Sequence, residues 1–113
     1  MTRHAKYKDF SIGDEVSGFQ LSVGSYSGDA GDALAYSNGM KFTTYDEDND
    51  TDGSNCAIQW SGGFWYHSCY HTNPFGPIRK KGDGMGMRWN KWLSGINIKK
   101  MVFKISPRTP TII

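Results

Sequence analysis

Five carboxylates lie within one seven-residue stretch near the middle of the chain, and side chains so crowded could bind a cation. Three of them, Asp48, Asp50 and Asp52, alternate with other residues and precede Gly53, which is the spacing of the first half of an EF-hand loop. Gln59 stands where that motif needs a bidentate Glu, and neither flank has a helical pattern. The sequence therefore rejects an EF-hand but keeps its oxygen-donor chemistry.

Two interpretations of this acidic stretch stay open from the residues alone. Unpaired carboxylates at about 4 Å repel each other by roughly 1–4 kcal/mol, and a divalent cation would relieve that repulsion. Calcium accepts six to eight oxygens in a flexible geometry, so two carboxylates could be supplemented by backbone carbonyls of the turn from Asp52 to Ser54. A solvated acidic loop accounts for the pattern equally well.

Two other chemistries are less favoured. Glycosidases place their paired carboxylates across a cleft rather than in one loop, and no cleft partner can be found, so we predict no enzymatic activity. His67, Cys69 and His71 would share one face of an extended strand and, with Cys56, could imitate a zinc site. Zinc sites usually carry tighter CxxC turns, which this chain lacks.

Composition bounds the class of protein. The 113 residues include 14 glycines and 16 Phe, Trp and Tyr, which predicts one small, loop-rich domain. Residues 79–108 contain nine Lys or Arg and one acid, but no nucleic-acid-binding motif presents them, so a solvated basic face is favoured over a nucleic-acid site.

No stretch approaches the ~18 apolar residues of a membrane span, and the first ten residues lack a signal's apolar core. Cys56 and Cys69 enclose twelve residues, a loop short enough for a local disulfide, which would imply an oxidising compartment.

The spacing of turn-forming residues along the chain predicts short strands joined by long loops. Phe19, Leu21 and Val23 alternate with polar residues and predict a half-buried strand that ends at Gly24. We further expect a short element over 33–36, a hairpin-type turn at 38–39, a strand over 41–45, and a strand over 101–105 that ends at Pro107. The predicted class is α+β, mostly β with long irregular loops.

The aromatic residues are interpreted first as core. We expect at least two of Phe64, Trp65 and Tyr66 to be buried, and Trp89 to be buried against the loop that it follows. Trp92 is expected to have a packing role as well.

Several segments occur together in a recognisable order: "YSGDAGDAL", "NGMKFTTYDEDND", "NCA", "GGFWYHSC", two tryptophans and "MVFKISP". This set resembles the fibrinogen C-terminal domain, the fibrinogen-related module of ficolins, tachylectins, tenascins and angiopoietins. The resemblance runs from about Ala5 to Arg108 and covers the later half of that domain. It implies that residues 1–113 are a partial fibrinogen C-terminal domain, with a twisted antiparallel sheet and a calcium-binding loop subdomain but without the N-terminal subdomain. It also implies secretion, and oligomerisation through upstream segments that are absent here.

The resemblance implies a metal site and a covalent link. The family's Ca²⁺ site falls on the carboxylates of Asp48 and Asp50 and the backbone carbonyls of Asp52 and Ser54. A disulfide is implied between Cys56 and Cys69, and a cis peptide bond before Cys69.

The resemblance also implies a ligand site beside the calcium loop. In ficolins and tachylectins a small pocket holds the acetyl group of N-acetylated sugars, and the matching or neighbouring positions here are Trp60, Cys69, Tyr70 and His71. Tyr70 replaces the family's His, which falls one place later, and Asp83 and Gly84 replace an aromatic-Ala pair. Two functions follow as alternatives: a lectin-like module for acetylated carbohydrate, or a matrix or receptor-ligand module that binds protein and keeps calcium for structure.

Overall fold

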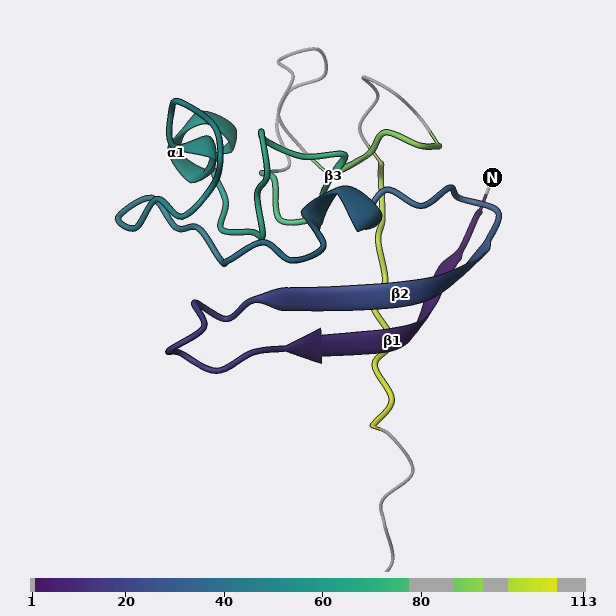
Figure 1. Cartoon of the computed structure of the whole chain (residues 1–113). Coiled ribbons are helices and arrows are strands. Elements are labelled where there is room, and N and C mark those ends of the chain that lie inside the picture. Colours follow the sequence, from purple (N-terminus) through teal and green to yellow (C-terminus); the bar gives the residue numbers. More distant parts are fainter. Residues whose placement is uncertain (1, 78–86, 93–97, 108–113) are drawn as a thin grey trace, which may run out of the picture.

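A computed structural model describes residues 2–77, 87–92 and 98–107 of the chain. Within them the structure consists of the strands β1 (Ala5–Ile12), β2 (Leu21–Gly28), β3 (Thr72–Asn73) and β4 (Arg88–Trp89), the 3-10 helix η1 (Ala35–Ser37) and the α-helix α1 (Cys56–Trp60). Figure 1 shows the β1–β2 hairpin on one side and α1 with its surrounding loops on the other. The predicted class, mostly strand and irregular loop with little helix, is confirmed.

The hairpin is antiparallel, with Tyr7 opposite Tyr26 and Ile12 opposite Leu21. The sequence analysis missed β1, although Ala5 and Tyr7 alternate there with lysines. The prediction for β2 was wrong at both ends. Phe19 has a φ of 55° and lies in the turn, and the strand continues through Gly24 because Gly24 pairs with Asp9 of β1.

The turn at Asn38–Gly39 is not of the hairpin type. Asn38 has φ −61° and ψ 134°, Gly39 has φ 80°, and the amide of Met40 donates to the carbonyl of Ser37 at 3.1 Å. These values define a type II turn, whose third position favours glycine. The turn brings the chain back to Leu21, whose amide donates to the carbonyl of Met40.

Two predicted strands are not formed within the described residues. Over 41–45 the structure has only single bridges, from Thr43 to Phe64 and from Thr44 to Glu47, because the chain turns sharply into the acidic stretch. Residues 101–105 form no strand and pair with no described strand. β-propensity indicated an extended backbone in both places but could not supply a ladder partner.

Helix α1 was missed by the sequence analysis. Asn55 is its N-cap, and the side-chain Oδ1 of Asn55 accepts hydrogen bonds from the amides of Ala57 and Ile58. Asparagine is among the best N-cap residues, so the "NCA" segment carried a start signal. Ser61 ends the helix in the left-handed conformation.

Two small cores hold the structure together. One contains Cys56, Ala57, Phe64 and Tyr66, so two of the three aromatics expected to be core are buried, while Trp65 packs at its edge. The other contains Ala30, Ala33 and the buried Trp89, with Trp92 packed against it. The burial of Trp89 is confirmed, but the loop before it, including Asp83 and Gly84, lies outside the described residues. No helix within the described ranges is long and apolar enough to cross a membrane.

Candidate functional site

The acidic stretch is a loop ordered by its own carboxylates. Asp48 Oδ1 accepts a hydrogen bond from the amide of Asp50 at 3.2 Å, and Asp50 Oδ1 accepts one from the amide of Asp52 at 3.0 Å. The second oxygen of Asp50 accepts from the amide of Cys56 at 2.9 Å, at the start of α1. The carboxylates of Asp48 and Asp50 thus fold the loop, because each accepts a hydrogen bond from the backbone amide two residues later.

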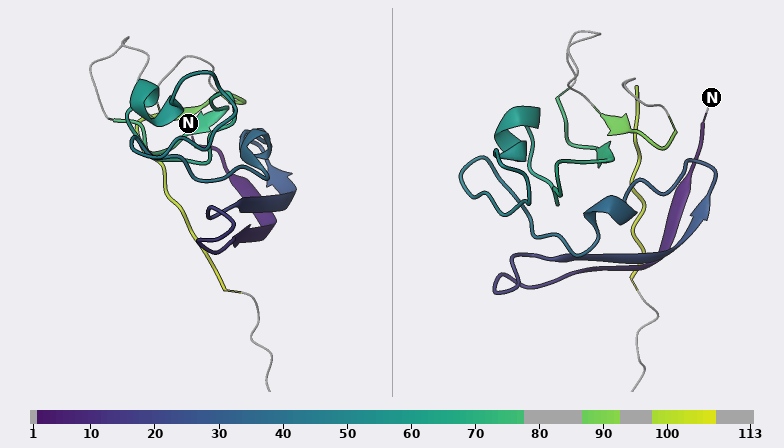
Figure 2. Two further views of the ribbon diagram at one scale, coloured as in Figure 1. Left: turned by 60° about the vertical axis from the view of Figure 1, so that its left-hand side comes forward. Right: turned by 45° about the horizontal axis from the view of Figure 1, so that its top comes forward.

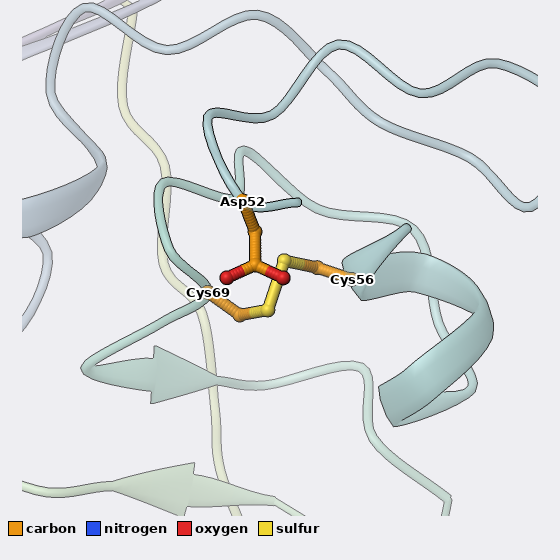
Figure 3. A group of neighbouring side chains, drawn as sticks. All are labelled: Asp52, Cys56 and Cys69. Carbon is orange, nitrogen blue, oxygen red and sulfur yellow. A yellow bond between two sulfur atoms is a disulfide. The ribbon is translucent and has the colours of Figure 1, made fainter. Parts of the chain in front are cut away.

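The Asp52 carboxylate connects this loop to the segment around Cys69. Its Oδ2 accepts from the hydroxyl of Ser54 at 2.7 Å, and its Oδ1 accepts from the hydroxyl of Ser68 at 2.9 Å. Figure 3 shows the carboxylate lying over a disulfide between Cys56 and Cys69. The peptide bond between Ser68 and Cys69 is cis, as the resemblance implies.

The electrostatics of the loop suit a cation. Burial raises the pKa of Asp50, and the adjacent Asp48 carboxylate raises it further, against the lowering effect of the Cys56 amide. Hydrogen bonds from Ser54 and Ser68 lower the pKa of Asp52 and hold that group ionised. Because carboxylate oxygens have two lone pairs each, their present hydrogen bonds leave acceptor capacity. The donor set is all oxygen, and its crowding is the repulsion that Ca²⁺ relieves, so these residues fit the ion.

The loop is anchored at three further points. Asn49 donates from Nδ2 to the carbonyl of Phe42 at 2.9 Å, and its amide donates to the hydroxyl of Thr43 at 3.0 Å. Thr51 lies against His67: the Thr51 amide donates to the His67 carbonyl, and Thr51 Oγ1 lies 3.2 Å from Nδ1 of the ring. The loop is therefore positioned by backbone and side-chain groups of residues that extend from Phe42 to His67.

A polar depression of about 460 Å³ lies beside the disulfide, and we call it the Trp60 depression. The rings of Trp60 and Tyr70 meet edge to face in its wall, with centroids 5.2 Å apart and planes at 85°. Its lining residues are Asp52, Ser54, Gln59, Trp60, Ser68, Cys69, Tyr70 and Asn90. The structure therefore brings three predicted ligand residues, Trp60, Cys69 and Tyr70, next to two predicted calcium-loop residues.

The fourth predicted ligand residue, His71, is not among the lining residues of the Trp60 depression. Its ring stacks on Tyr36 with centroids 3.9 Å apart and planes at 10°, and His67 contacts the same ring at 4.6 Å. Cys56 and Cys69 cannot act as zinc ligands, because both are in the disulfide and neither can supply a thiolate.

Sequence reasoning missed Gln59, Ser68 and Asn90 as parts of the depression. Ser68 directly precedes Cys69, which was predicted as a ligand residue, so its position in the sequence could have indicated that it belongs to the site. Asn90 reaches the site because its amide donates to the carbonyl of His71 at 2.8 Å, a tertiary contact with no local signature.

The family model described as the C-terminal globular domain of fibrinogen beta and gamma chains matches residues 1–108. This chain belongs to the fibrinogen C-terminal domain family. Among its curated relatives, tenascin of Gallus gallus is 41% identical over 91 residues, which are 80% of this chain and 5% of that protein. Tenascin-N of Mus musculus is 45% identical over 89 residues, or 79% of this chain and 6% of the relative.

Solved structures of fibrinogen-like domains agree with the fold. The fibrinogen-like globe domain of human ANGPTL6 has a TM-score of 0.78 and 35% identity, covering 83% of this chain and 45% of that one. A lamprey fibrin D-dimer complexed with the peptide Gly-His-Arg-Pro-amide has a TM-score of 0.78 at 25% identity, covering 96% of this chain and 44% of that one. This fibrinogen C-terminal domain chain thus spans less than half of each of these two solved structures.

Proposed function

We propose that this fibrinogen C-terminal domain is a secreted, non-enzymatic recognition module that binds Ca²⁺ and takes acetylated carbohydrate into the Trp60 depression. One observation carries the proposal: Trp60 and Tyr70 lie edge to face in the wall of a depression that Asp52 and Ser54 of the acidic loop also line. Aromatic faces beside hydrogen-bonding groups are the combination that small polar ligands with an apolar part require.

The proposed calcium ligands are the carboxylates of Asp48 and Asp50 and the backbone carbonyls of Asp52 and Ser54. A bound ion would supply positive charge that offsets the repulsion within the loop. The chain's own residues would transmit that order to the depression, because Asp52 holds Ser68 and the disulfide joins α1 to Cys69.

Recognition would divide between apolar and polar groups. The rings of Trp60 and Tyr70 would pack against an acetyl methyl group, while Gln59 and Asn90 could hydrogen-bond to hydroxyl or amide groups. No described residue accepts a hydrogen bond from the amides of Cys69 and Tyr70, which supports their use as donors to a ligand carbonyl.

A protein ligand is the second candidate, with calcium kept for structure. The lamprey fibrin structure, similar over 96% of this chain, contains a bound peptide, and the tenascin and ANGPTL6 relatives carry fibrinogen-like domains of this kind. In this version the module would belong to a matrix or receptor-ligand protein, without nucleic acid as a partner.

A glycan array probed in Ca²⁺ and again in chelator separates the two candidates. Signal on N-acetylated sugars that disappears in chelator is expected for the lectin-like module. An array without signal, from protein shown to be folded, would overturn carbohydrate binding and favour the protein ligand.

Substitutions locate the binding. Tyr70→Ala should lower affinity for N-acetylglucosamine, measured by ligand-observed NMR, by about tenfold because half of the aromatic wall is lost. Val16→Ser is the matched control, since Val16 is 95% exposed at the β1–β2 turn, away from the lining residues. Equal losses in both variants would contradict the assignment.

A further inference from the structure

A second hollow lies on the opposite face of α1 and is open to solvent. This groove, of about 590 Å³, is lined by Thr44, Tyr45, Asp46, Ala57, Ile58, Ser61, Gly62 and Gly63, and we call it the Tyr45 groove. With about 100° between helix residues, Ala57 and Ile58 project from one side of α1, while Gln59 and Trp60 project from the other toward the Trp60 depression. The two hollows are therefore separate surfaces, and the proposed function uses only one.

The walls of the Tyr45 groove are unusually apolar for an exposed surface. Tyr45 is 75% exposed and Ile58 is 62% exposed, and both line the groove. Gly62 and Gly63 also line the groove and present backbone alone, and position 62 requires glycine because a Cβ there would stand 2.6 Å from the carbonyl oxygen of Phe75. A large aliphatic and a large aromatic side chain kept in solvent around a hollow are typical of a docking surface.

The charge around the groove selects the occupant. Asp46 lines the groove and Glu47 follows it, both exposed. From Phe42 to Tyr66, a range that includes every groove residue, the chain has five acids and no Lys, Arg or His. The formal charge there is −5, and one Ca²⁺ would reduce it only to −3. An apolar segment that also carries positive charge would thus be attracted, and an acidic one repelled.

We propose that the Tyr45 groove binds a basic peptide segment of a partner protein, in which an apolar side chain enters between Tyr45 and Ile58 and an adjacent Lys or Arg faces Asp46. The volume is in the range of small-ligand sites and accommodates one or two side chains rather than a helix. Because the two hollows lie on opposite sides of α1, the Tyr45 groove and the Trp60 depression could be occupied at once.

The test is selection from a random displayed-peptide library on the full chain in Ca²⁺, with counter-selection on the Tyr45→Ser, Ile58→Ser double variant. Peptides that pair Leu, Ile or Phe with Lys or Arg are expected to be enriched. A lack of enrichment, or enriched peptides that are acidic or neutral, would overturn the proposal. Gel filtration of both proteins covers the other occupant: a dimer that the double variant abolishes would assign the groove to a second copy and reject the peptide.

Affinity measurements on the best enriched peptide locate its contacts. Ile58→Ser should weaken binding by about tenfold, and Asp46→Asn should weaken it less and reduce its salt dependence. Both side chains are exposed, so circular dichroism should show unchanged folding. Val16→Ser and Glu15→Gln, on the β1–β2 turn, are matched controls for the apolar and acidic changes. Unchanged affinity in both groove variants would contradict the site.

Discussion

The β1–β2 hairpin and the acidic loop region, residues 43–73, are held together in different ways. The hairpin is a ladder of backbone hydrogen bonds over Ala5–Ile12 and Leu21–Gly28, and most of its side chains are exposed. The acidic loop region has single bridges, a five-residue helix and the two-residue strand β3, and many of its backbone groups are satisfied by side chains such as those of Asp50, Asn49 and Asn55. Most residues that line the Tyr45 groove and the Trp60 depression belong to the second region.

This difference shows where sequence identity matters most. A backbone ladder tolerates many side chains, because its hydrogen bonds are made by groups that every residue except proline has. A loop capped by side chains tolerates few changes, since each Asp or Asn removed leaves an N–H or C=O without its partner. Figure 2 shows that the irregular region forms a layer of its own beside the hairpin, so the two can respond separately to substitutions.

Removing the disulfide is the strongest way to break the comparison. Replacing Cys56 and Cys69 together with Ser should lower the free energy of unfolding by about 3 kcal/mol, because a cross-link over a sequence separation of 13 restricts the unfolded chain. Amide hydrogen exchange should rise mainly over 43–73 and much less over β1 and β2. Equal acceleration in the hairpin would show that the two regions unfold as one unit.

Calcium should act on the same region with a slightly smaller effect. At a Ca²⁺ concentration about 100 times its Kd, binding to the folded state adds about 2.7 kcal/mol and raises Tm. Asp50→Asn should abolish the rise in Tm measured by calorimetry, whereas Glu15→Gln on the hairpin turn should keep it. A rise that survives Asp50→Asn would place the ion elsewhere.

Two asparagines test the comparison between the regions, with expected losses of stability of intermediate size. Asn55 caps α1 through Oδ1 and donates from Nδ2 to the carbonyls of Thr44 and Tyr45. Asn38 makes one hydrogen bond of this kind: its side-chain Oδ1 accepts from the amide of Val23 in β2 at 2.9 Å. Asn55→Ala should therefore cost about 2 kcal/mol in urea unfolding, and Asn38→Ala about 1 kcal/mol. A larger loss at Asn38 would reverse the proposed ranking of the regions.

The same contrast explains what could be predicted from the sequence. Membership of the family and the mostly-β class were predictable, because they rest on conspicuous motifs and composition. The pairing of β1 with β2 was not, since an exposed strand such as Ala5–Ile12 lacks a clear apolar face. The strand predicted over 41–45 was wrong because its propensity is overridden by the carboxylate-capped turns that follow it.

The candidate site was predictable where residues are close in sequence. The spacing of Asp48, Asp50 and Asp52 indicated an acidic loop with oxygen donors at alternate positions, and the structure shows these carboxylates accepting hydrogen bonds from the amides of Asp50, Asp52 and Ser54. Asn90 could not be found, because its position depends on the pairing of β3 with β4. His71 was placed by adjacency to Tyr70, but neighbouring residues in extended backbone point to opposite sides.

The smallest predicted effect is a loss of stability at mildly acidic pH that depends on His71. Burial lowers the pKa of His71, and the positive charge of Lys91 and the neighbouring His67 lower it further. As pH falls below about 6.5, the usual value for His, the unfolded chain takes up a proton that the folded state resists. Stability from this group is thus complete above about pH 6.5 and declines as pH falls toward the lowered pKa.

Urea unfolding at pH 7.5 and pH 5.0 measures that decline. His71→Phe can keep the stacking on Tyr36 but cannot titrate, so its midpoint should change less with pH than that of the unmodified chain. His4→Phe is the matched control, because His4 is exposed at the start of the hairpin and should leave the decline intact. If His4→Phe flattened the pH dependence and His71→Phe did not, the pH-sensitive group would belong to the hairpin rather than to the histidine stack on Tyr36.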